Sequence, residues 1–136
     1  MERTFGDRRW NADLLAKIFG GIFIIVGILG FIPNPLVSDR GLFEVNTLHN
    51  LIHIVSGGVL LASPYYNAPA IALRVVGVIY ALVTVLGFIS LDSLNSMGVA
   101  ANHPDNWLHL ALTVALLWAG FALPAEDRDR VTTAHM

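Results

Sequence analysis

The sequence predicts an all-α protein, a bundle of four transmembrane helices built as two parallel helical-hairpin repeats. Hydrophobic residues make up 55% of the 136 residues and charged residues only 13%, whereas an ordinary soluble domain carries about 25% charged residues. Charged residues also divide the chain into four long uncharged stretches, and two blocks of sequence recur after nearly the same interval. These three observations predict that lipid, rather than water, surrounds the chain.

The four helices are expected at about residues 12–32, 47–63, 70–91 and 104–123. Each uncharged stretch is close to, or exceeds, the roughly 20 apolar residues that a membrane crossing needs. Prolines mark the ends, because Pro33 follows the first helix and Pro64 and Pro69 flank the central turn. Pro104 falls in the first turn of the last helix, where a missing N–H costs nothing. The first stretch is longer than the apolar part of a signal peptide and lacks a cleavage motif, so we interpret it as a span.

The whole chain, residues 1–136, is expected to form a single membrane domain. Repeat 1 covers about 12–63, repeat 2 covers about 70–123, and a polar tail follows at 124–136. The net charge of −2 provides no basic surface for nucleic acid. The absence of cysteine excludes disulfides and thiolate metal sites. The expected partners are therefore the lipid bilayer and either other membrane proteins or further copies of the chain.

The positions of lysine and arginine predict the orientation in the membrane. Seven of the eight fall in the N-terminus, the central turn or the C-terminal tail: Arg3, Arg8, Arg9, Lys17, Arg74, Arg128 and Arg130. Only Arg40 falls on the opposite side. Because cytoplasmic loops carry the excess of positive charge, we expect a multi-pass protein of the plasma membrane with both termini in the cytoplasm. The segments 33–46 and 92–103 are then extracytoplasmic.

Two blocks of sequence define the internal repeat. The segment 28–32 recurs at 85–89 with a shared Leu-Gly-Phe-Ile, and the segment 46–53 recurs at 102–109. The second block has the pattern N-x-x-[HD]-N-x-x-H and follows the first block in both halves. Both halves enter the membrane from the same side, so the pseudo-twofold axis should lie along the membrane normal. The two N-x-x-[HD]-N-x-x-H motifs then begin at the same outer face and can meet.

Each motif forms a polar stripe, because positions i, i+3, i+4 and i+7 share one face of a helix. The eight residues of the two stripes are Asn46, His49, Asn50, His53, Asn102, Asp105, Asn106 and His109. Lipid cannot form hydrogen bonds with them, and an unpaired polar group in hydrocarbon costs several kcal/mol. We therefore expect the two stripes to face each other inside the bundle.

A divalent-metal site is the leading interpretation of this cluster. His49 and His53 are spaced i, i+4, as are Asp105 and His109. Three imidazoles and one carboxylate on facing helices suit zinc, iron or manganese. The four asparagines of the stripes would then support the site by orienting the imidazoles.

Two alternatives remain open at this point. Asn46 and Asn102 stand where N-caps stand, so the cluster could be an interhelical polar network in a non-catalytic accessory or structural subunit of a larger membrane complex. His53 and His109 occupy equivalent positions and could instead ligate haem or a chlorophyll. No nucleophile has a recognisable catalytic setting, so we expect a protein that is not an enzyme. The sequence predicts neither a substrate nor an oligomeric state.

The motifs H-N-x-x-H at 49–53 and D-N-x-x-H at 105–109, each after a Gly-Phe-Ile span end, resemble a bacterial family of small four-span membrane proteins. That family is catalogued only as a domain of unknown function. The resemblance covers roughly residues 12–123 and all eight residues of the polar stripes. It implies a four-helix membrane fold and supplies no activity, substrate or cofactor.

Overall fold

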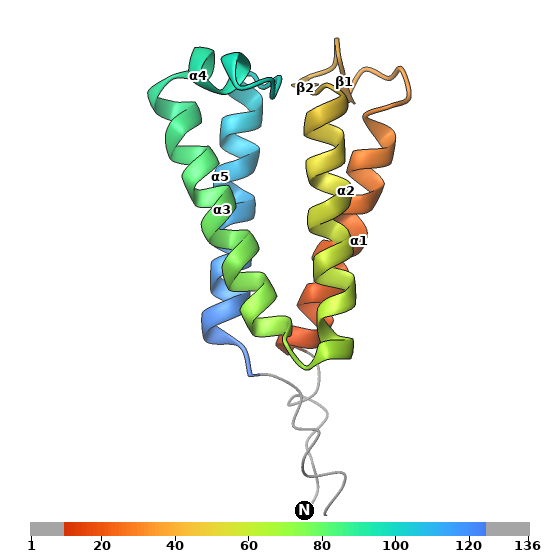
Figure 1. Ribbon diagram of the computed structural model, residues 1–136, viewed down its shortest axis with the longest axis vertical. Helices are drawn as coiled ribbons and strands as arrows, with labels where there is room; N and C mark the ends of the chain where they lie inside the picture. The colour runs from red at the N-terminus through yellow and green to blue at the C-terminus, as the bar shows by residue number, and fades with distance from the viewer. Residues whose placement is uncertain (1–9, 125–136) are drawn as a thin grey trace, which may run out of the picture.

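The computed structural model describes residues 10–124, which form five α-helices, one 3-10 turn and a pair of short strands (Figure 1). The elements are α1 (Ala12–Leu29), β1 (Val37–Ser38), β2 (Phe43–Glu44), α2 (Thr47–Ala62), η1 (Ser63–Tyr66), α3 (Pro69–Ile89), α4 (Leu91–Ser96) and α5 (His103–Ala122). The prediction of a helical chain is thus confirmed. Most of the positive charges used to predict the orientation lie outside the described residues, namely Arg3, Arg8, Arg9, Arg128 and Arg130, as does most of the tail.

Asparagine side chains begin three of the four long helices. Asn11 accepts a hydrogen bond from the backbone N–H of Leu14 at the start of α1. Asn46 and Asn102 do the same for α2 and α5. A side-chain oxygen at this position satisfies one of the N–H groups that a helix leaves unpaired at its start. The third long helix, α3, begins instead with Pro69 in its first turn, where no N–H is needed.

The segments that follow α1 and α3 contain short elements that the sequence did not predict. The six-residue helix α4 follows α3 directly, and the side chain of Ser90 caps it. In the corresponding part of the first half, β1 and β2 pair in parallel over two residues each. Both are too short for a periodic pattern in the sequence.

The four long helices pack as two pairs, α1 with α2 and α3 with α5 (Figure 1). Glycines let the backbones within each pair approach closely. A Cβ atom on Gly20 would lie 2.7 Å from Leu61 Cγ in the first pair, and one on Gly77 would lie 2.8 Å from Leu117 Cδ2 in the second. The strands and α4 lie at one end of the pairs, and η1 lies at the other. We call the first of these the outer end.

The outward surface of the helices is apolar. Large aliphatic and aromatic side chains are exposed along all four long helices. Six of the eight residues of the polar stripes are buried, namely His49, Asn50, His53, Asp105, Asn106 and His109. Two helices, α1 and α3, are long and apolar enough to cross a membrane, each with a mean hydropathy of 2.2 over 18 residues. The functional site must therefore be sought in the buried polar interior.

Candidate metal centre

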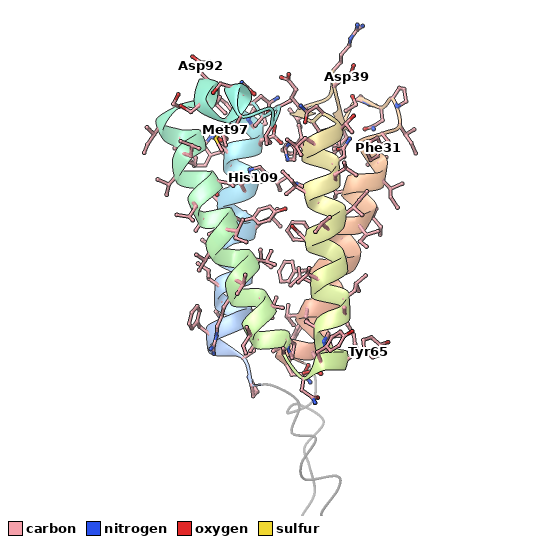
Figure 2. All side chains as sticks on the ribbon, in the orientation of Figure 1. Phe31, Asp39, Tyr65, Asp92, Met97 and His109 are labelled. Carbon is pink, nitrogen blue, oxygen red and sulfur yellow. The ribbon has the colours of Figure 1, made fainter. Side chains whose placement is uncertain are left out.

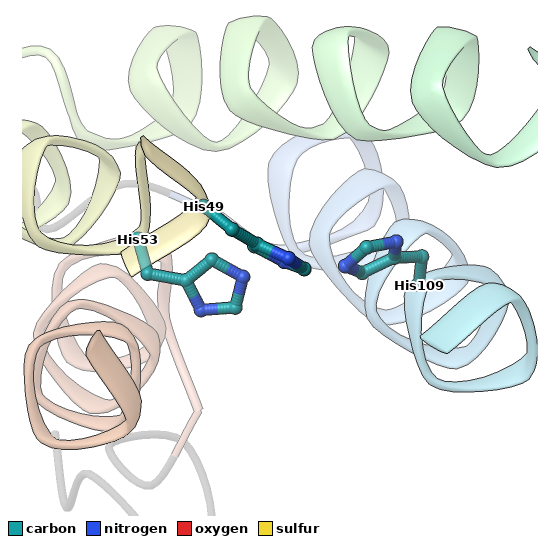
Figure 3. Close-up of side chains that lie close together, drawn as sticks. All are labelled: His49, His53 and His109. Atoms are coloured by element: carbon teal, nitrogen blue, oxygen red, sulfur yellow. The ribbon is translucent and has the colours of Figure 1, made fainter. Parts of the chain in front are cut away.

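Three histidines meet at the outer end between the two helix pairs. α2 contributes His49 and His53, and α5 contributes His109 (Figure 3). Each is at most 5% exposed, and each offers a ring nitrogen that lies within 4.8 Å of the other two. The ring centroids are 4.8 Å apart for His49 and His53, 5.5 Å for His49 and His109, and 6.2 Å for His53 and His109. We call these three residues the histidine triad.

Three of the six ring nitrogens of the triad are buried without a hydrogen-bond partner among the described residues. Both nitrogens of His53 and the Nδ1 atom of His109 are buried with no partner among the described residues. Leaving such an atom unsatisfied costs roughly 1–3 kcal/mol, and a native protein has few of them. Three such atoms therefore lie close together in the triad.

A hydrogen bond to the backbone of the second half of the chain orients His49. The Nδ1 atom of His49 lies 2.6 Å from the carbonyl oxygen of Ala100. A carbonyl oxygen can only accept, so Nδ1 carries the proton and donates it. In the neutral ring the lone pair is then on Nε2, which is the arrangement commonly found for a metal-binding imidazole.

Asp105 is placed differently from the other three predicted ligands. Its Oδ2 atom accepts hydrogen bonds from the backbone N–H of Asn102 at 2.9 Å and of Glu44 at 3.1 Å. Together with the Asn102 cap, the first of these forms a capping box at the start of α5. Its side chain is 2% exposed, yet it does not belong to the histidine triad. Three of the four predicted ligands therefore lie together, whereas the fourth, Asp105, binds backbone N–H groups.

Asn46 and Asn102 join the two halves of the chain at the outer end. Besides capping α2, Asn46 donates from Nδ2 to the carbonyl oxygen of Gly98 at 2.8 Å. Asn102 donates in the same way to the carbonyl oxygen of Leu42 at 2.9 Å. Both side-chain amides therefore bind backbone carbonyl oxygens. The two bonds are equivalent in the repeat, because each donor and each acceptor is displaced by 56 residues from its counterpart.

His49 and Asp105 also form equivalent hydrogen bonds between the two halves, but one side chain donates and the other accepts. His49 donates to the carbonyl oxygen of Ala100, and Asp105 accepts from the N–H of Glu44. These positions are again 56 residues apart, 49 with 105 and 44 with 100. We call these four cross-half hydrogen bonds the outer clasp. An imidazole N–H suits a carbonyl partner and a carboxylate suits an N–H partner, so the different residues at the two equivalent positions match their partners.

The remaining stripe asparagines lie against glycines of the neighbouring helix. Asn106 donates from Nδ2 to the carbonyl oxygen of Gly87 at 3.0 Å, and its Oδ1 atom has no partner among the described residues. Asn50 packs against Gly30 in the same way, since a Cβ on Gly30 would collide with the amide of Asn50. These asparagines therefore pack helix on helix within each pair and make no hydrogen bond to the triad.

Two aromatic rings close the inner side of the triad. Phe23 of α1 lies 5.4 Å from His53, and Tyr80 of α3 lies 5.7 Å from His109, measured between ring centroids. The two rings meet edge to face at 5.1 Å, and the Tyr80 hydroxyl lies 3.4 Å from Ser56 Oγ. The sequence analysis missed both residues. The signal that could have found them is their separation of 57 residues, which makes them equivalent in the repeat.

The donor set of the triad can hold one ion of a nitrogen-preferring metal. Tetrahedral zinc with Zn–N bonds of about 2.0–2.1 Å needs its ligand nitrogens about 3.3 Å apart. One ring nitrogen from each histidine lies within 4.8 Å of the other two, so these nitrogens would have to move closer together around such an ion. Three imidazoles also leave one coordination position open.

No curated protein and no solved structure matches the chain. The family described as Domain of unknown function (DUF4383) matches residues 14–122. The match includes the histidine triad, the outer clasp and both aromatic rings. The prediction of a family without an assigned function is confirmed. The chain belongs to the DUF4383 family, a domain of unknown function.

Proposed function

We propose that this protein is a small integral membrane protein that holds one divalent metal ion on His49, His53 and His109. The observation that carries the proposal is the set of three buried imidazoles brought together from two helices, of which His53 and His109 have unpartnered nitrogens. A metal ion would use these lone pairs and remove the cost of leaving them buried and unpaired. The carboxylate of Asp105, one helical turn from His109, would offset part of the metal's charge.

The chemistry of the donors narrows the choice of metal. Imidazole nitrogens suit zinc and iron, whereas manganese favours carboxylate and other oxygen ligands. With Asp105 bonded to backbone N–H groups, the site is better matched to zinc or iron than to manganese. A tetrapyrrole is less suited, because the ring of His49 lies within 5.5 Å of both other imidazoles and occupies the space beside them.

The membrane assignment extends from two helices to four in this proposal. α1 and α3 are long and apolar enough to cross a membrane, and α2 and α5 pack along them. α2 exposes Val55 and Val59, and α5 exposes Val114 and Phe121. An apolar surface on this scale is unusual for a soluble monomer. The 16 residues of α2 span about 24 Å, and η1 continues the chain at its inner end.

A parallel duplication of a helical hairpin accounts for the paired contacts. The outer clasp supports it, since its four bonds fall into two equivalent pairs. Glycine contacts within the helix pairs support it as well, because Gly20 with Leu61 corresponds to Gly77 with Leu117. By the distribution of lysine and arginine, the outer end faces away from the cytoplasm and the protein belongs to the plasma membrane.

Elemental analysis of the purified protein tests the proposal. We expect close to one zinc or iron per chain, and loss of that metal in a His53→Ala plus His109→Ala variant. His103→Ala is the matched control, because His103 also belongs to α5 but is exposed. Metal-free wild-type protein of unchanged stability would contradict the proposal. That result would favour the accessory-subunit function, with the histidine triad serving as interhelical packing.

A further inference from the structure

A half-buried arginine lies in the apolar helix α3, near the end of the bundle that carries η1, which we call the inner end. Arg74 is the sixth residue of α3, about 7.5 Å along the helix from Pro69. The nearby side chains of Ile71, Val75 and Val78 are aliphatic and exposed, and α3 is long and apolar enough to cross a membrane. An ionisable residue within such a span indicates a functional site whose partner should be identified.

Contacts within the second helix pair hold the guanidinium group of Arg74 in place. Its Nε atom donates to the carbonyl oxygen of Gly120, near the C-terminal end of α5, at 2.8 Å. Its Cζ atom lies 4.5 Å from the centroid of the Phe121 ring. Gly120 leaves room for the stem of the arginine, because a Cβ there would lie 2.9 Å from Arg74 Cγ. A guanidinium group that is already fixed loses little conformational freedom when it binds a ligand.

Four of the five N–H donors of this guanidinium group are unused. Only the Nε–H of Arg74 has a partner within residues 10–124. The two Nη atoms are not among the buried unpartnered atoms, so both are accessible from outside the bundle. Their N–H groups form a planar fork that matches two oxygens of one phosphate or carboxylate group. The arginine can therefore bind an anion without breaking any contact described above.

The position of the arginine selects a lipid phosphate as that anion. Side chains of a helix point towards its N-terminus, so Arg74 reaches towards the inner end. Tyr65, labelled at that end in Figure 2, and the adjacent Tyr66 are 81% and 80% exposed. Exposed tyrosines are typical of the membrane–water interface, at the level of the lipid headgroups. The phosphates of that layer lie within reach of the arginine, and acyl chains can lie along Ile71 and Val75.

We infer that Arg74 binds the phosphate of one anionic phospholipid in the leaflet at the inner end. Its Nη groups donate to two phosphate oxygens, while the acyl chains lie along the exposed aliphatic face of α3. A zwitterionic lipid is less suited, because its own ammonium group competes for the phosphate. The inference rests on the membrane assignment proposed above and does not depend on metal binding at the triad.

Lys17 provides a matched comparison within the same chain. It precedes Arg74 by 57 residues and is likewise the sixth residue of its helix, α1. Lys17 is exposed and has no hydrogen-bond or ion-pair partner within residues 10–124. Its ammonium group also lacks the planar fork of a guanidinium group. Lys17→Gln therefore removes the same charge at an equivalent depth and leaves the fixed guanidinium group in place.

Native mass spectrometry of the full-length protein in detergent tests the inference. The probes are dioleoyl phosphatidylglycerol and, as the zwitterionic comparison, dioleoyl phosphatidylcholine. We expect one tightly retained phosphatidylglycerol per chain and weaker binding of phosphatidylcholine. Arg74→Gln should weaken phosphatidylglycerol binding about fivefold to tenfold, between the values for an exposed ion pair and for a hydrogen bond to a charged group. Lys17→Gln should change it less than about twofold, because an exposed, unfixed charge contributes little.

A second variant separates binding from folding. Arg74→Gln also removes the hydrogen bond to Gly120, whereas Arg74→Lys keeps the charge and loses only the fork and the Nε donor. Arg74→Lys should also weaken phosphatidylglycerol binding, and its melting temperature without added lipid shows whether the fold is intact. The inference is overturned if phosphatidylcholine binds as tightly as phosphatidylglycerol, or if Arg74→Gln and Lys17→Gln have the same effect. Release of the protein from membranes by alkaline carbonate would instead refute the membrane assignment itself.

Discussion

Replacing His53 with leucine separates a metal site from an interhelical polar network. His53 is 5% exposed and both of its ring nitrogens lack partners among the described residues. If the histidine is retained for metal, it destabilises the metal-free fold, and an apolar side chain of similar volume should stabilise that fold. If it instead holds helices together by hydrogen bonds, the same change should destabilise the protein under all conditions.

The expected change in the free energy of unfolding follows from the contacts of the His53 ring. Removing two unpartnered nitrogens relieves about 1–3 kcal/mol for each. Losing the ring contacts with Phe23 and Tyr80 at 5.4 and 6.1 Å costs about 0.5–1.5 kcal/mol for each. The net stabilisation of metal-free His53→Leu is then about 2 kcal/mol, which corresponds to a rise in Tm of about 6 °C for a chain of this size.

Tryptophan fluorescence during heating, in detergent, measures both states. In chelator, His53→Leu should unfold at a higher temperature than the wild type. With zinc at 100 times its Kd, the wild type should gain about 2.7 kcal/mol, and His53→Leu should gain nothing. The exposed His103, changed to leucine, serves as the control and should follow the wild type. The reasoning is refuted if His53→Leu unfolds below the wild type in chelator.

Two further pairs of variants test the outer clasp and the helix pairing. His49→Asn places an amide N–H near the position of the imidazole Nδ1, so this variant should keep the hydrogen bond to Ala100 and lose the metal. His49→Ala should lose both. Metal content and the Tm in chelator distinguish the two variants. Gly20→Ala should lower the free energy of unfolding by about 2 kcal/mol through overpacking, because its Cβ would lie 2.9 Å from the carbonyl oxygen of Gly57. The neighbouring Gly21→Ala has nothing within 4 Å of its Cβ and should be neutral or stabilising. Equal melting temperatures for these two variants would contradict the packing described.

The four long helices could be predicted from the sequence because their ends carry local signals. The first was expected at 12–32 and is observed at Ala12–Leu29, and the last was expected at 104–123 and is observed at His103–Ala122. Asparagine caps and prolines mark these ends, and neither needs tertiary contacts to act. The helix α4 could not be predicted in this way. Its six residues are held by burial of Leu94 in the second helix pair, which no local pattern reveals.

The sequence could predict which residues share the helical face of the candidate site, but not which of them join the histidine triad and which bind backbone. Helical spacing alone places His49 and His53 on one side of α2, and the structure brings them to His109. Metal binding by these residues stays a prediction. Asp105 has the same spacing relative to His109, yet its carboxylate turns to the N–H groups of Asn102 and Glu44. That choice depends on a backbone segment 61 residues away in the chain, so spacing could not reveal it.

Equivalent hydrogen bonds join the two halves, and the histidine triad lies where their sequences differ. The outer clasp needs a donor in one half and an acceptor in the other, so histidine occurs at position 49 and aspartate at position 105. This difference leaves three imidazoles instead of four, so the proposed tetrahedral ion would have one open coordination position.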